Sequence, residues 1–271
     1  MPGPLSGRVA LVTGAGRGIG AAHARRLASD GARVVVNDAG VNLDGTAANE
    51  PVAEQVAALI RASGGEAIAD TSDVGSFDGA AAAVRAALDV YGRIDILVNN
   101  AGIIGSAHVD DLDQESLQRM FAVHVTGSVA AIRAAWPAMR ANRYGRIVNT
   151  TSEAAYDPRM GAGVPYATAK AAIWGLTMAA AGEGAPHGIT VNAISPGART
   201  RMSESFLAAG ADNGLDLSPE HVARVVALLV REDAGDVTGR VVHAAAGFVR
   251  EYVLGRSPDT ELVTRLGLVR E

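Results

Sequence analysis

Short apolar runs rich in β-branched residues alternate along this chain with longer alanine-rich segments of helical periodicity. The runs predict strands at Val9–Thr13, Val34–Asn37, Glu66–Ala69, Ile94–Asn99, Ile147–Thr150, Thr190–Ile194 and Val241–Ala244. The segments between them predict helices at Ile19–Ser29, Val52–Ser63, Phe77–Tyr91, Gln114–Asn142, Tyr166–Gly184 and Pro219–Arg231. Strict alternation is typical of βαβ units with right-handed crossovers. We therefore predict an α/β fold in which a doubly wound, seven-stranded parallel sheet carries helices on both faces.

The chain holds enough apolar material for one full core. It has 271 residues, 48% of them hydrophobic, and shows no internal repeat or linker, so we predict one domain over residues 1–271 that ends in a short C-terminal tail. Two irregular stretches, Gly40–Glu50 and Arg199–Ser218, follow predicted strands, which is where ligands sit in open α/β sheets. Within the second, Met202–Ser218 with its Phe206 is either a lid over substrate or a surface loop.

Charge and residue usage argue against several classes of function. The net charge is −5 with both signs interspersed, which predicts neither a nucleic-acid nor a membrane partner. Cysteine is absent, so disulfides, thiolate zinc sites and cysteine nucleophiles are excluded. The six histidines form no close ligand pair, and we predict no metal site. Without a recognisable signal peptide or apolar span, a cytoplasmic protein with a small-molecule substrate is expected.

A glycine-rich turn follows the first predicted strand and opens a helix. It reads Thr13-Gly14-Ala15-Gly16-Arg17-Gly18-Ile19-Gly20, and its glycines allow backbone N–H groups to approach a pyrophosphate at the helix N-terminus. Asp38 closes the next strand, where a carboxylate accepts from adenosine ribose hydroxyls and repels a 2′-phosphate. Arg17 argues the other way, because a guanidinium could meet that phosphate. We predict a bound dinucleotide, with NAD preferred over NADP.

Tyr166 and Lys170 lie four residues apart, on one face of a predicted helix. Such pairs are common on helix surfaces, but Lys170 is the only lysine in a chain that otherwise uses arginine. A phenol near pKa 10 is a poor base at neutral pH, and a neighbouring ammonium lowers that pKa. The pair therefore indicates an acid/base group and the cation that tunes it.

The glycine spacing T-G-x-x-x-G-x-G and the run Asn99-Asn100-Ala101-Gly102 resemble the short-chain dehydrogenase/reductase family over about residues 7–250. The resemblance implies a single-domain Rossmann fold that binds a nicotinamide dinucleotide. It implies contacts to the cofactor from Gly14, Gly16, Arg17, Gly18, Ile19, Gly20, Asp38, Asp73, Val74, Asn100, Ala101, Gly102, Pro196, Gly197 and Thr200. Thr200 stands one position early for the nicotinamide contact, and Arg201 takes the usual place.

By the same resemblance, Tyr166 is the catalytic acid/base, and Lys170 also donates to the nicotinamide ribose. Ser152 is expected to hydrogen-bond the substrate oxygen. It precedes Tyr166 by 14 residues, one more than is usual in the family, so we expect a bulged loop, with Thr151 as the alternative. His124 stands where the family has an asparagine that holds a relay water, and it either keeps that relay or fills the space.

Histidine at that position, together with Arg133-Ala134-Ala135-Trp136-Pro137 and the ending Ala246-Gly247-Phe248, is similar to one subgroup. This is the 3-hydroxyacyl-CoA dehydrogenase unit of peroxisomal multifunctional enzymes. The resemblance implies an NAD-dependent oxidoreductase for a secondary alcohol and ketone pair, with a 3-hydroxyacyl-CoA or similar bulky hydroxy substrate.

Other functions fit the same motifs. A hydroxysteroid dehydrogenase and a 3-oxoacyl-carrier-protein reductase share the chemistry, although the latter generally prefers NADP, against Asp38. A non-catalytic dinucleotide-sensing protein is a different class, whose members usually lack the tyrosine or the lysine. The family also implies a homotetramer that pairs the helices starting at Gln114 and Tyr166 with their counterparts.

Overall fold

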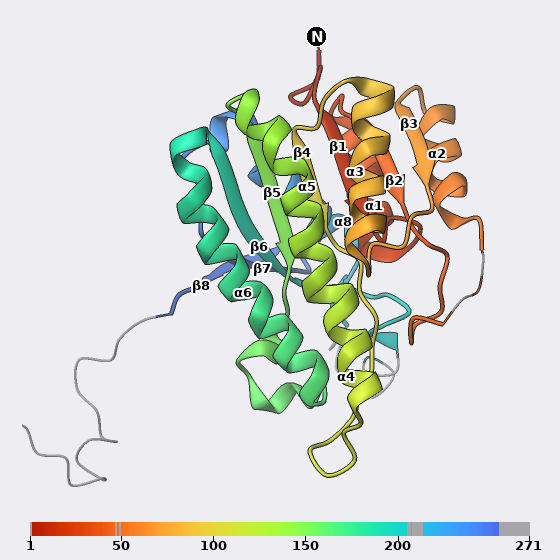
Figure 1. The fold of residues 1–271 in the computed structure, drawn as a ribbon, viewed down its shortest axis with the longest axis vertical. Helices are drawn as coiled ribbons and strands as arrows, with labels where there is room; N and C mark the ends of the chain where they lie inside the picture. The colour runs from red at the N-terminus through yellow and green to blue at the C-terminus, as the bar shows by residue number, and fades with distance from the viewer. Residues whose placement is uncertain (1, 47, 49, 205–206, 208–213, 255–271) are drawn as a thin grey trace, which may run out of the picture.

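Eight strands among the described residues form one sheet in the order β3-β2-β1-β4-β5-β6-β7-β8 (Figure 1). They are β1 Val9–Thr13, β2 Arg33–Asn37, β3 Glu66–Asp70, β4 Ile96–Asn99, β5 Gly145–Thr150, β6 Ile189–Gly197, β7 Val241–Ala245 and β8 Phe248–Tyr252. All neighbouring pairs from β3 to β7 are parallel, and β8 pairs antiparallel with β7. The predicted seven-stranded parallel sheet is therefore confirmed and gains an eighth, antiparallel edge strand.

This computed structural model describes residues 2–46, 48, 50–204, 207 and 214–254. Residues 205–206 and 208–213 of the predicted lid Met202–Ser218, Phe206 among them, and the predicted C-terminal tail after residue 254 lie outside the described residues. Within the described part of the chain, none of the helices combines the length and the apolar character needed to cross a membrane.

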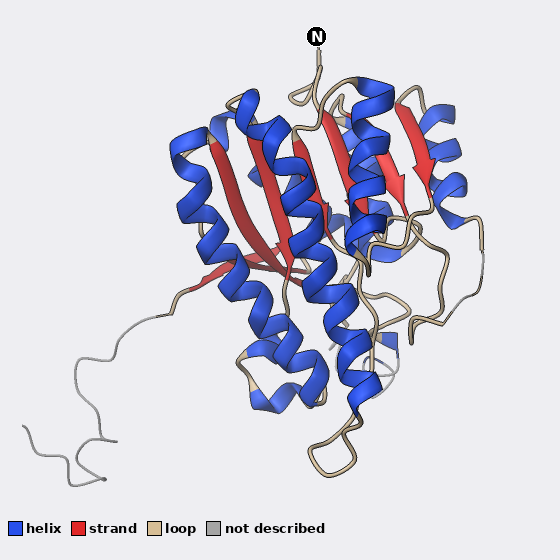
Figure 2. Cartoon of the chain, in the orientation of Figure 1, coloured by secondary structure: helices blue, strands red, loops and turns tan. Residues whose placement is uncertain are grey.

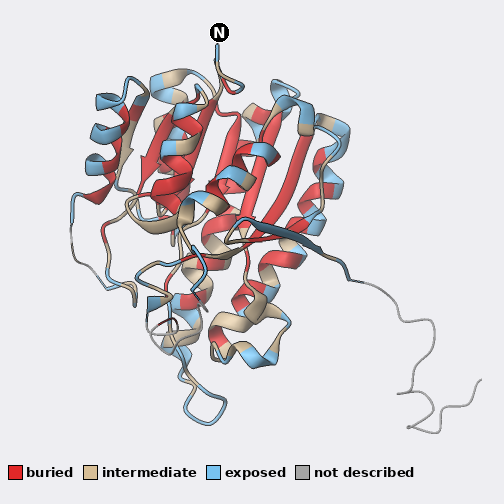
Figure 3. Cartoon of the chain, turned by 180° about the vertical axis from the view of Figure 1, so that it is seen from behind, coloured by how far each residue is buried: buried red, intermediate tan, exposed pale blue. Residues whose placement is uncertain are grey.

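Helices cover both faces of the sheet (Figure 2). They are α1 Gly18–Ser29, α2 Val52–Ala62, α3 Phe77–Tyr91, α4 Gln114–Phe121, α5 Gly127–Ala141, α6 Val164–Gly184 and α8 Pro219–Leu229. One core lies under α1, α2 and α8, and a second lies under α3, α5 and α6. Because both faces are covered, every residue of β1 is buried (Figure 3). This is why the central strands read as continuous apolar runs rather than alternating ones.

The segment predicted as one helix, Gln114–Asn142, is interrupted in the structure. A π-helical turn, η1 Ala122–Thr126, separates α4 from α5, and His124 lies at its centre. A π turn widens the helix by one residue locally and leaves the apolar periodicity on either side intact, so the sequence pattern does not reveal it. The prediction was right about helical backbone here and wrong about its continuity.

The eighth strand depends on a two-residue turn. Ala246 and Gly247 both have positive φ, +48° and +81°, and join β7 to β8 as a tight hairpin. Phe248 and Val249 are exposed, so β8 lacks the buried alternation by which a strand is recognised in a sequence.

The chain reverses its direction of sheet growth between β1 and β4. Strands β2 and β3 extend the sheet on one side of β1, and β4 to β7 extend it on the other. At such a switch point the loops beyond the two carboxyl ends diverge and leave a crevice for a ligand. The parallel registers bring those carboxyl ends to one edge, which is the lower edge of the sheet in Figure 1.

Candidate active site

A cavity of about 400 Å³ opens at this edge of the sheet. The predicted residues that line it are Gly14, Arg17, Gly18, Ile19, Gly20, Asp38, Asp73, Val74, Asn100, Ala101, Gly102, Ser152, Tyr166, Lys170, Pro196 and Thr200. Two predicted contacts, Gly16 and Gly197, do not line it. A Cβ on Gly197 would lie 2.7 Å from Ala245 Cβ, so that glycine serves the close approach of β6 and β7.

The glycine turn leaves the start of α1 open to a ligand. Arg17, the N-cap residue, provides no side-chain cap, and the first turn of the helix carries no acidic residue. Helix N-terminal N–H groups without an internal partner attract an anion such as a pyrophosphate. The turn itself is tight: a Cβ on Gly20 would lie 2.1 Å from the Gly14 carbonyl oxygen. These features fit the phosphates of a dinucleotide.

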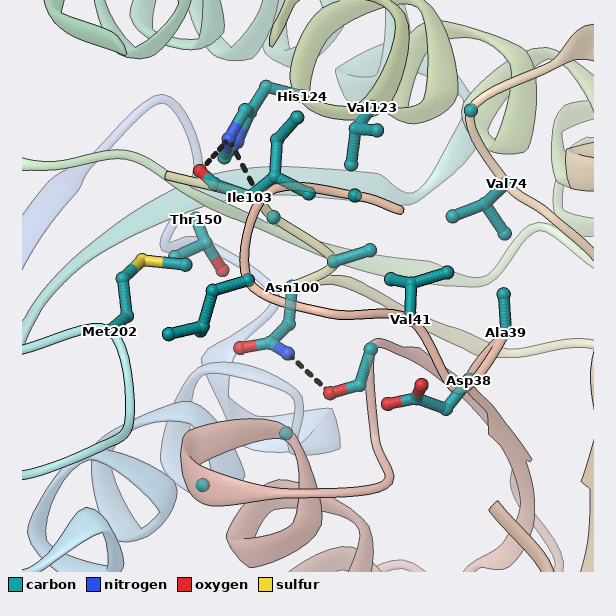
Figure 4. Close-up of a pocket in the computed structure, with 18 of the residues that line it drawn as sticks. Asp38, Ala39, Val41, Val74, Asn100, Ile103, Val123, His124, Thr150 and Met202 are labelled. Atoms are coloured by element: carbon teal, nitrogen blue, oxygen red, sulfur yellow. Dashed lines mark hydrogen bonds between the residues drawn. The ribbon is translucent and has the colours of Figure 1, made fainter. Parts of the chain in front are cut away.

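Asn100 braces this turn against the end of β4 (Figure 4). Its side-chain amide donates to the carbonyl oxygens of Thr13 and Gly14, both at 3.0 Å. In return, the Thr13 hydroxyl accepts the backbone N–H groups of Asn100 and Ala101 at 3.0 and 3.1 Å. The two central strands on either side of the crevice are thereby held together at the cavity.

Asp38 is fixed at the end of β2 by two backbone donors. Its carboxylate accepts from Gly16 N at 2.9 Å and from Gly40 N at 2.8 Å. Gly16 thus holds Asp38 rather than facing the cavity. Arg17 forms an ion pair with Glu50, from the long loop after β2, so its guanidinium is already partnered by a carboxylate.

The same loop crosses the cavity, which sequence reasoning did not anticipate in detail. Val41 and Leu43 line the cavity, and the Leu43 carbonyl accepts from Ile104 N at 2.9 Å. Ile103 lines it from the loop after β4 (Figure 4). The signal in the sequence was only the unusual length of Gly40–Glu50, because a loop's path depends on what it meets across the fold.

Tyr166, Lys170 and Ser152 line the same cavity. Lys170 is buried, and its ammonium donates to the Thr150 carbonyl at 2.8 Å, 5.5 Å from the centre of the Tyr166 ring. Burial lowers the pKa of Lys170 to about 7. Burial raises the pKa of the Tyr166 phenol, and a hydrogen bond with the Ser152 hydroxyl lowers it in part. The phenol is therefore protonated at neutral pH in the chain without ligands.

The structure separates the two candidates for the third catalytic position. The Thr151 hydroxyl is buried and donates to the Lys170 carbonyl at 2.8 Å. Ser152 instead meets Tyr166 and accepts from Ala154 N at 3.2 Å. The loop between β5 and α6, where a bulge was expected, holds two short 3₁₀ turns, η2 Glu153–Ala155 and η3 Pro158–Met160.

His124 is buried against the backbone of the neighbouring loop. Its Nε2 lies 2.9 Å from the Ile103 carbonyl and 3.2 Å from the Ile103 amide nitrogen (Figure 4). Its ring meets Tyr166 edge to face with centroids 5.6 Å apart, while Nδ1 has no hydrogen-bond partner among the described residues. Burial and the charge of Lys170 hold the pKa of His124 well below its usual value, although the Ile103 bond raises it, so the ring is neutral.

On the nicotinamide side predicted for Pro196 and Thr200, the loop after β6 closes on the glycine turn. A Cβ on Gly18 would lie 3.2 Å from Thr200 Cγ2. Arg201 and Met202 line the cavity beside Thr200 and were not among the predicted contacts.

A glycine turn, an uncapped helix start, and a tyrosine and lysine pair across one cavity define an oxidoreductase site for a nicotinamide dinucleotide. The chain belongs to the short-chain dehydrogenase family, whose family model matches residues 8–209. Proteins of this family bind NAD or NADP.

Several known proteins are similar to the chain. A putative short-chain type dehydrogenase/reductase of Mycobacterium tuberculosis is 41% identical over 87% of this chain and 81% of its own length. The peroxisomal multifunctional enzyme type 2 of Drosophila melanogaster is 40% identical over 94% of this chain, and the peroxisomal hydratase-dehydrogenase-epimerase of Saccharomyces cerevisiae is 38% identical over 95%. The chain spans only 42% and 28% of the length of these two peroxisomal proteins.

A solved structure supports the same assignment. A short chain dehydrogenase from Mycobacterium avium superposes with a TM-score of 0.83 at 40% identity, covering 96% of this chain and 90% of that one. The similarity to the multifunctional-enzyme subgroup, expected from the sequence, is confirmed by the two peroxisomal relatives described above.

Proposed function

We propose that this chain is an NAD-dependent dehydrogenase that interconverts a secondary alcohol and its ketone, with a 3-hydroxyacyl-CoA or a similarly bulky hydroxy compound as substrate. One observation carries the proposal: Ser152, Tyr166 and Lys170 line a single cavity together with the glycine turn and Asp38, and the Ser152 hydroxyl contacts the Tyr166 phenol. Bound there, the nicotinamide would exchange a hydride with the substrate's carbinol carbon.

The chain's own residues supply the proton chemistry. The Tyr166 phenol gives a proton to the carbonyl oxygen during reduction and takes one from the hydroxyl during oxidation. The Ser152 hydroxyl, already in contact with that phenol, holds the same oxygen. The charged form of Lys170 favours the phenolate. Burial raises the pKa of the phenol and lowers that of the ammonium, so at neutral pH Tyr166 holds the proton that reduction of a carbonyl requires.

The surroundings of the adenosine end support NAD as the cofactor. The Asp38 carboxylate is held toward the glycine turn by two backbone donors, so it does not rotate away easily from a 2′-phosphate. Arg17 would be the natural partner of that phosphate, but Glu50 pairs with it.

The substrate class is supported by the relatives. Peroxisomal proteins named multifunctional enzyme and hydratase-dehydrogenase-epimerase match nearly the whole of this chain over a part of their own length.

We further propose that the chain forms one domain over residues 1–271, that it is cytoplasmic and that it assembles as a homotetramer.

The proposal is tested by following NADH consumption with 3-oxoacyl-CoA thioesters of several chain lengths and with keto-steroids. We expect turnover of a thioester with NADH, and a loss of about 10²–10⁴-fold in Tyr166→Phe, because the proton donor is removed. NADH binding, measured by fluorescence titration, is expected to persist in that variant. Thioester turnover that survives Tyr166→Phe would sink the mechanism, and turnover of steroids alone would refute the substrate class.

Cofactor preference is tested by two variants at the adenosine end. Asp38→Ala removes one carboxylate, and Glu50→Gln frees the Arg17 guanidinium, so each is expected to tighten NADPH binding relative to NADH. The double variant is expected to shift the ratio of the two dissociation constants by at least about tenfold, the equivalent of 1.4 kcal/mol. The ratio is measured by fluorescence titration, with Glu54→Gln, in α2, as a matched control. An unchanged ratio in the double variant removes both residues from cofactor selection.

A further inference from the structure

A cluster of titratable and aromatic side chains lies on the far side of the Ser152 turn from the cavity. It surrounds a second, shallower hollow lined by Glu153, Tyr156, Asp157, Pro158, Arg159, Arg250 and Tyr252. None of these residues lines the cavity that holds Tyr166. The short η2 turn therefore separates two hollows, with Ser152 facing the first and Glu153 facing the second.

Glu153 is tied to the edge of the sheet. Its carboxylate accepts a hydrogen bond from the Tyr252 hydroxyl, at the end of β8, and lies 3.7 Å from His243 Nδ1, on β7. Burial lowers the pKa of His243 and outweighs the opposing effect of Glu153, so the imidazole is neutral at pH 7 and Tyr252 is the main donor to the carboxylate. The bond joins residues 99 positions apart in the chain.

Aromatic packing holds both ends of this bond. The Tyr156 ring, just beyond η2, meets Trp174 of α6 edge to face at 5.5 Å and lies 4.6 Å from the Tyr252 ring. Trp174 is buried in a small apolar cluster with Ala193 and Val241, against which Tyr252 packs. The donor of the bond is thus set by β7, β8 and α6 rather than by the η2 turn itself.

The Ser152 hydroxyl depends on the orientation of η2. It accepts from Ala154 N at 3.2 Å as the N-cap of that turn, and the same hydroxyl contacts the Tyr166 phenol. A single turn of 3₁₀ helix is too short to hold its own orientation, so an external anchor is needed. Glu153, the first residue of the turn, provides it.

We propose that Glu153, held by Tyr252, is a positioning residue that sets the Ser152 hydroxyl against Tyr166 and the substrate oxygen. The role extends the proposed function, because it matters for catalysis only if Ser152 holds that oxygen. In this proposal, strand β8 contributes Tyr252, which holds the η2 turn beside Ser152 through Glu153.

The kinetic test uses the carbonyl substrate that the wild type reduces with NADH. Glu153→Ala is expected to lower kcat and kcat/KM by at least about tenfold, because a misplaced hydroxyl no longer supports the transition state. Glu153→Gln keeps an acceptor for Tyr252 and is expected to stay within about threefold of the wild type. Asp157→Asn, a carboxylate in the same hollow that Tyr252 does not contact, is the control and is expected to change little.

Non-additivity distinguishes positioning from general support of the fold. Adding Glu153→Ala to Ser152→Ala is expected to cause no further loss of kcat, since the hydroxyl that Glu153 positions is already absent. Effects that multiply in the double variant would overturn the proposal.

Crystal structures of the wild type and Glu153→Ala separate this inference from the proposed function. We expect the Ser152 hydroxyl to lose its contact with the Tyr166 phenol in the variant while Tyr166 and Lys170 stay in place. This arm holds even if the wild type reduces none of the carbonyl compounds, an outcome that counts against the proposed function alone. A Ser152 hydroxyl unmoved in Glu153→Ala refutes the positioning role.

Discussion

Lys170 shows how much one residue's surroundings decide. Its ammonium is buried and donates a hydrogen bond to the Thr150 carbonyl at the end of β5. A guanidinium has five donors in a rigid fork, so it would need more buried acceptors here than the compact ammonium does. That explains why a chain rich in arginine keeps its one lysine at this position.

Burial of the His23 side chain, in α1, lowers the stability of the folded chain. Both ring nitrogens lack a hydrogen-bond partner among the described residues, and burial lowers the pKa to about 3. Burying a polar group without a partner costs about 1–3 kcal/mol, so His23→Leu is expected to raise the free energy of unfolding by about that amount at pH 7. Thermal or urea unfolding measures it, and a destabilised leucine variant would mean that the ring has a partner in solution.

The lowered pKa of His23 predicts that the stability of the folded chain depends on pH. The unfolded chain takes up the proton near pH 6.5, whereas the folded chain resists it down to about pH 3. Stability is therefore full above pH 6.5 and is lost as the pH falls toward 3. The loss between pH 7 and pH 5 is expected to be smaller in His23→Leu than in the wild type. His108→Gln, an exposed histidine, is the control, and equal losses in all three proteins would contradict the assignment.

At the scale of elements, the hairpin between β7 and β8 carries a measurable strain. Ala246 has φ of +48°, a region where a Cβ costs about 1–2 kcal/mol and where asparagine is favoured before glycine. Ala246→Asn is expected to stabilise the protein by about 1 kcal/mol, which shifts the melting temperature by about 2–4 °C in a chain of this size. Gly247→Ala, with φ of +81° and nothing closer than 4.0 Å to its added Cβ, is expected to destabilise by a similar amount. Melting temperatures that move in the opposite directions would refute the hairpin.

At the scale of the whole molecule, the exposed side of α6 is the surface on which the predicted homotetramer depends. Gly175 and Gly182 are exposed, and a Cβ on either would meet nothing within 4 Å in its own chain. Gly175→Arg is therefore expected to keep the fold, judged by circular dichroism, while the tetramer dissociates in light scattering after gel filtration. Leu59→Arg, on the exposed side of α2, is the control. A tetramer that survives Gly175→Arg removes this face from the interface, and a monomeric wild type refutes the tetramer.

Much of the fold and of the cavity could be predicted because their signals are local. Central parallel strands such as β1 appear as continuous apolar runs, since both faces of the sheet are covered. The glycine turn and Asp38 lie at strand ends that the alternation of elements brings to one edge. The π turn at His124 and the exposed strand β8 escaped prediction, because neither changes the apolar periodicity that identifies an element.

The sequence by itself determined the class of fold, the dinucleotide turn and the tyrosine and lysine pair, because spacing within one element places those groups. Only the tertiary structure decided that Ser152 rather than Thr151 contacts the phenol. It also decided that Glu50 forms the ion pair with Arg17, and that the Tyr252 hydroxyl bonds Glu153. Each of those choices joins separate elements. The partner of a side chain across such a distance is set by how helices and strands pack, and packing is a property of the whole chain.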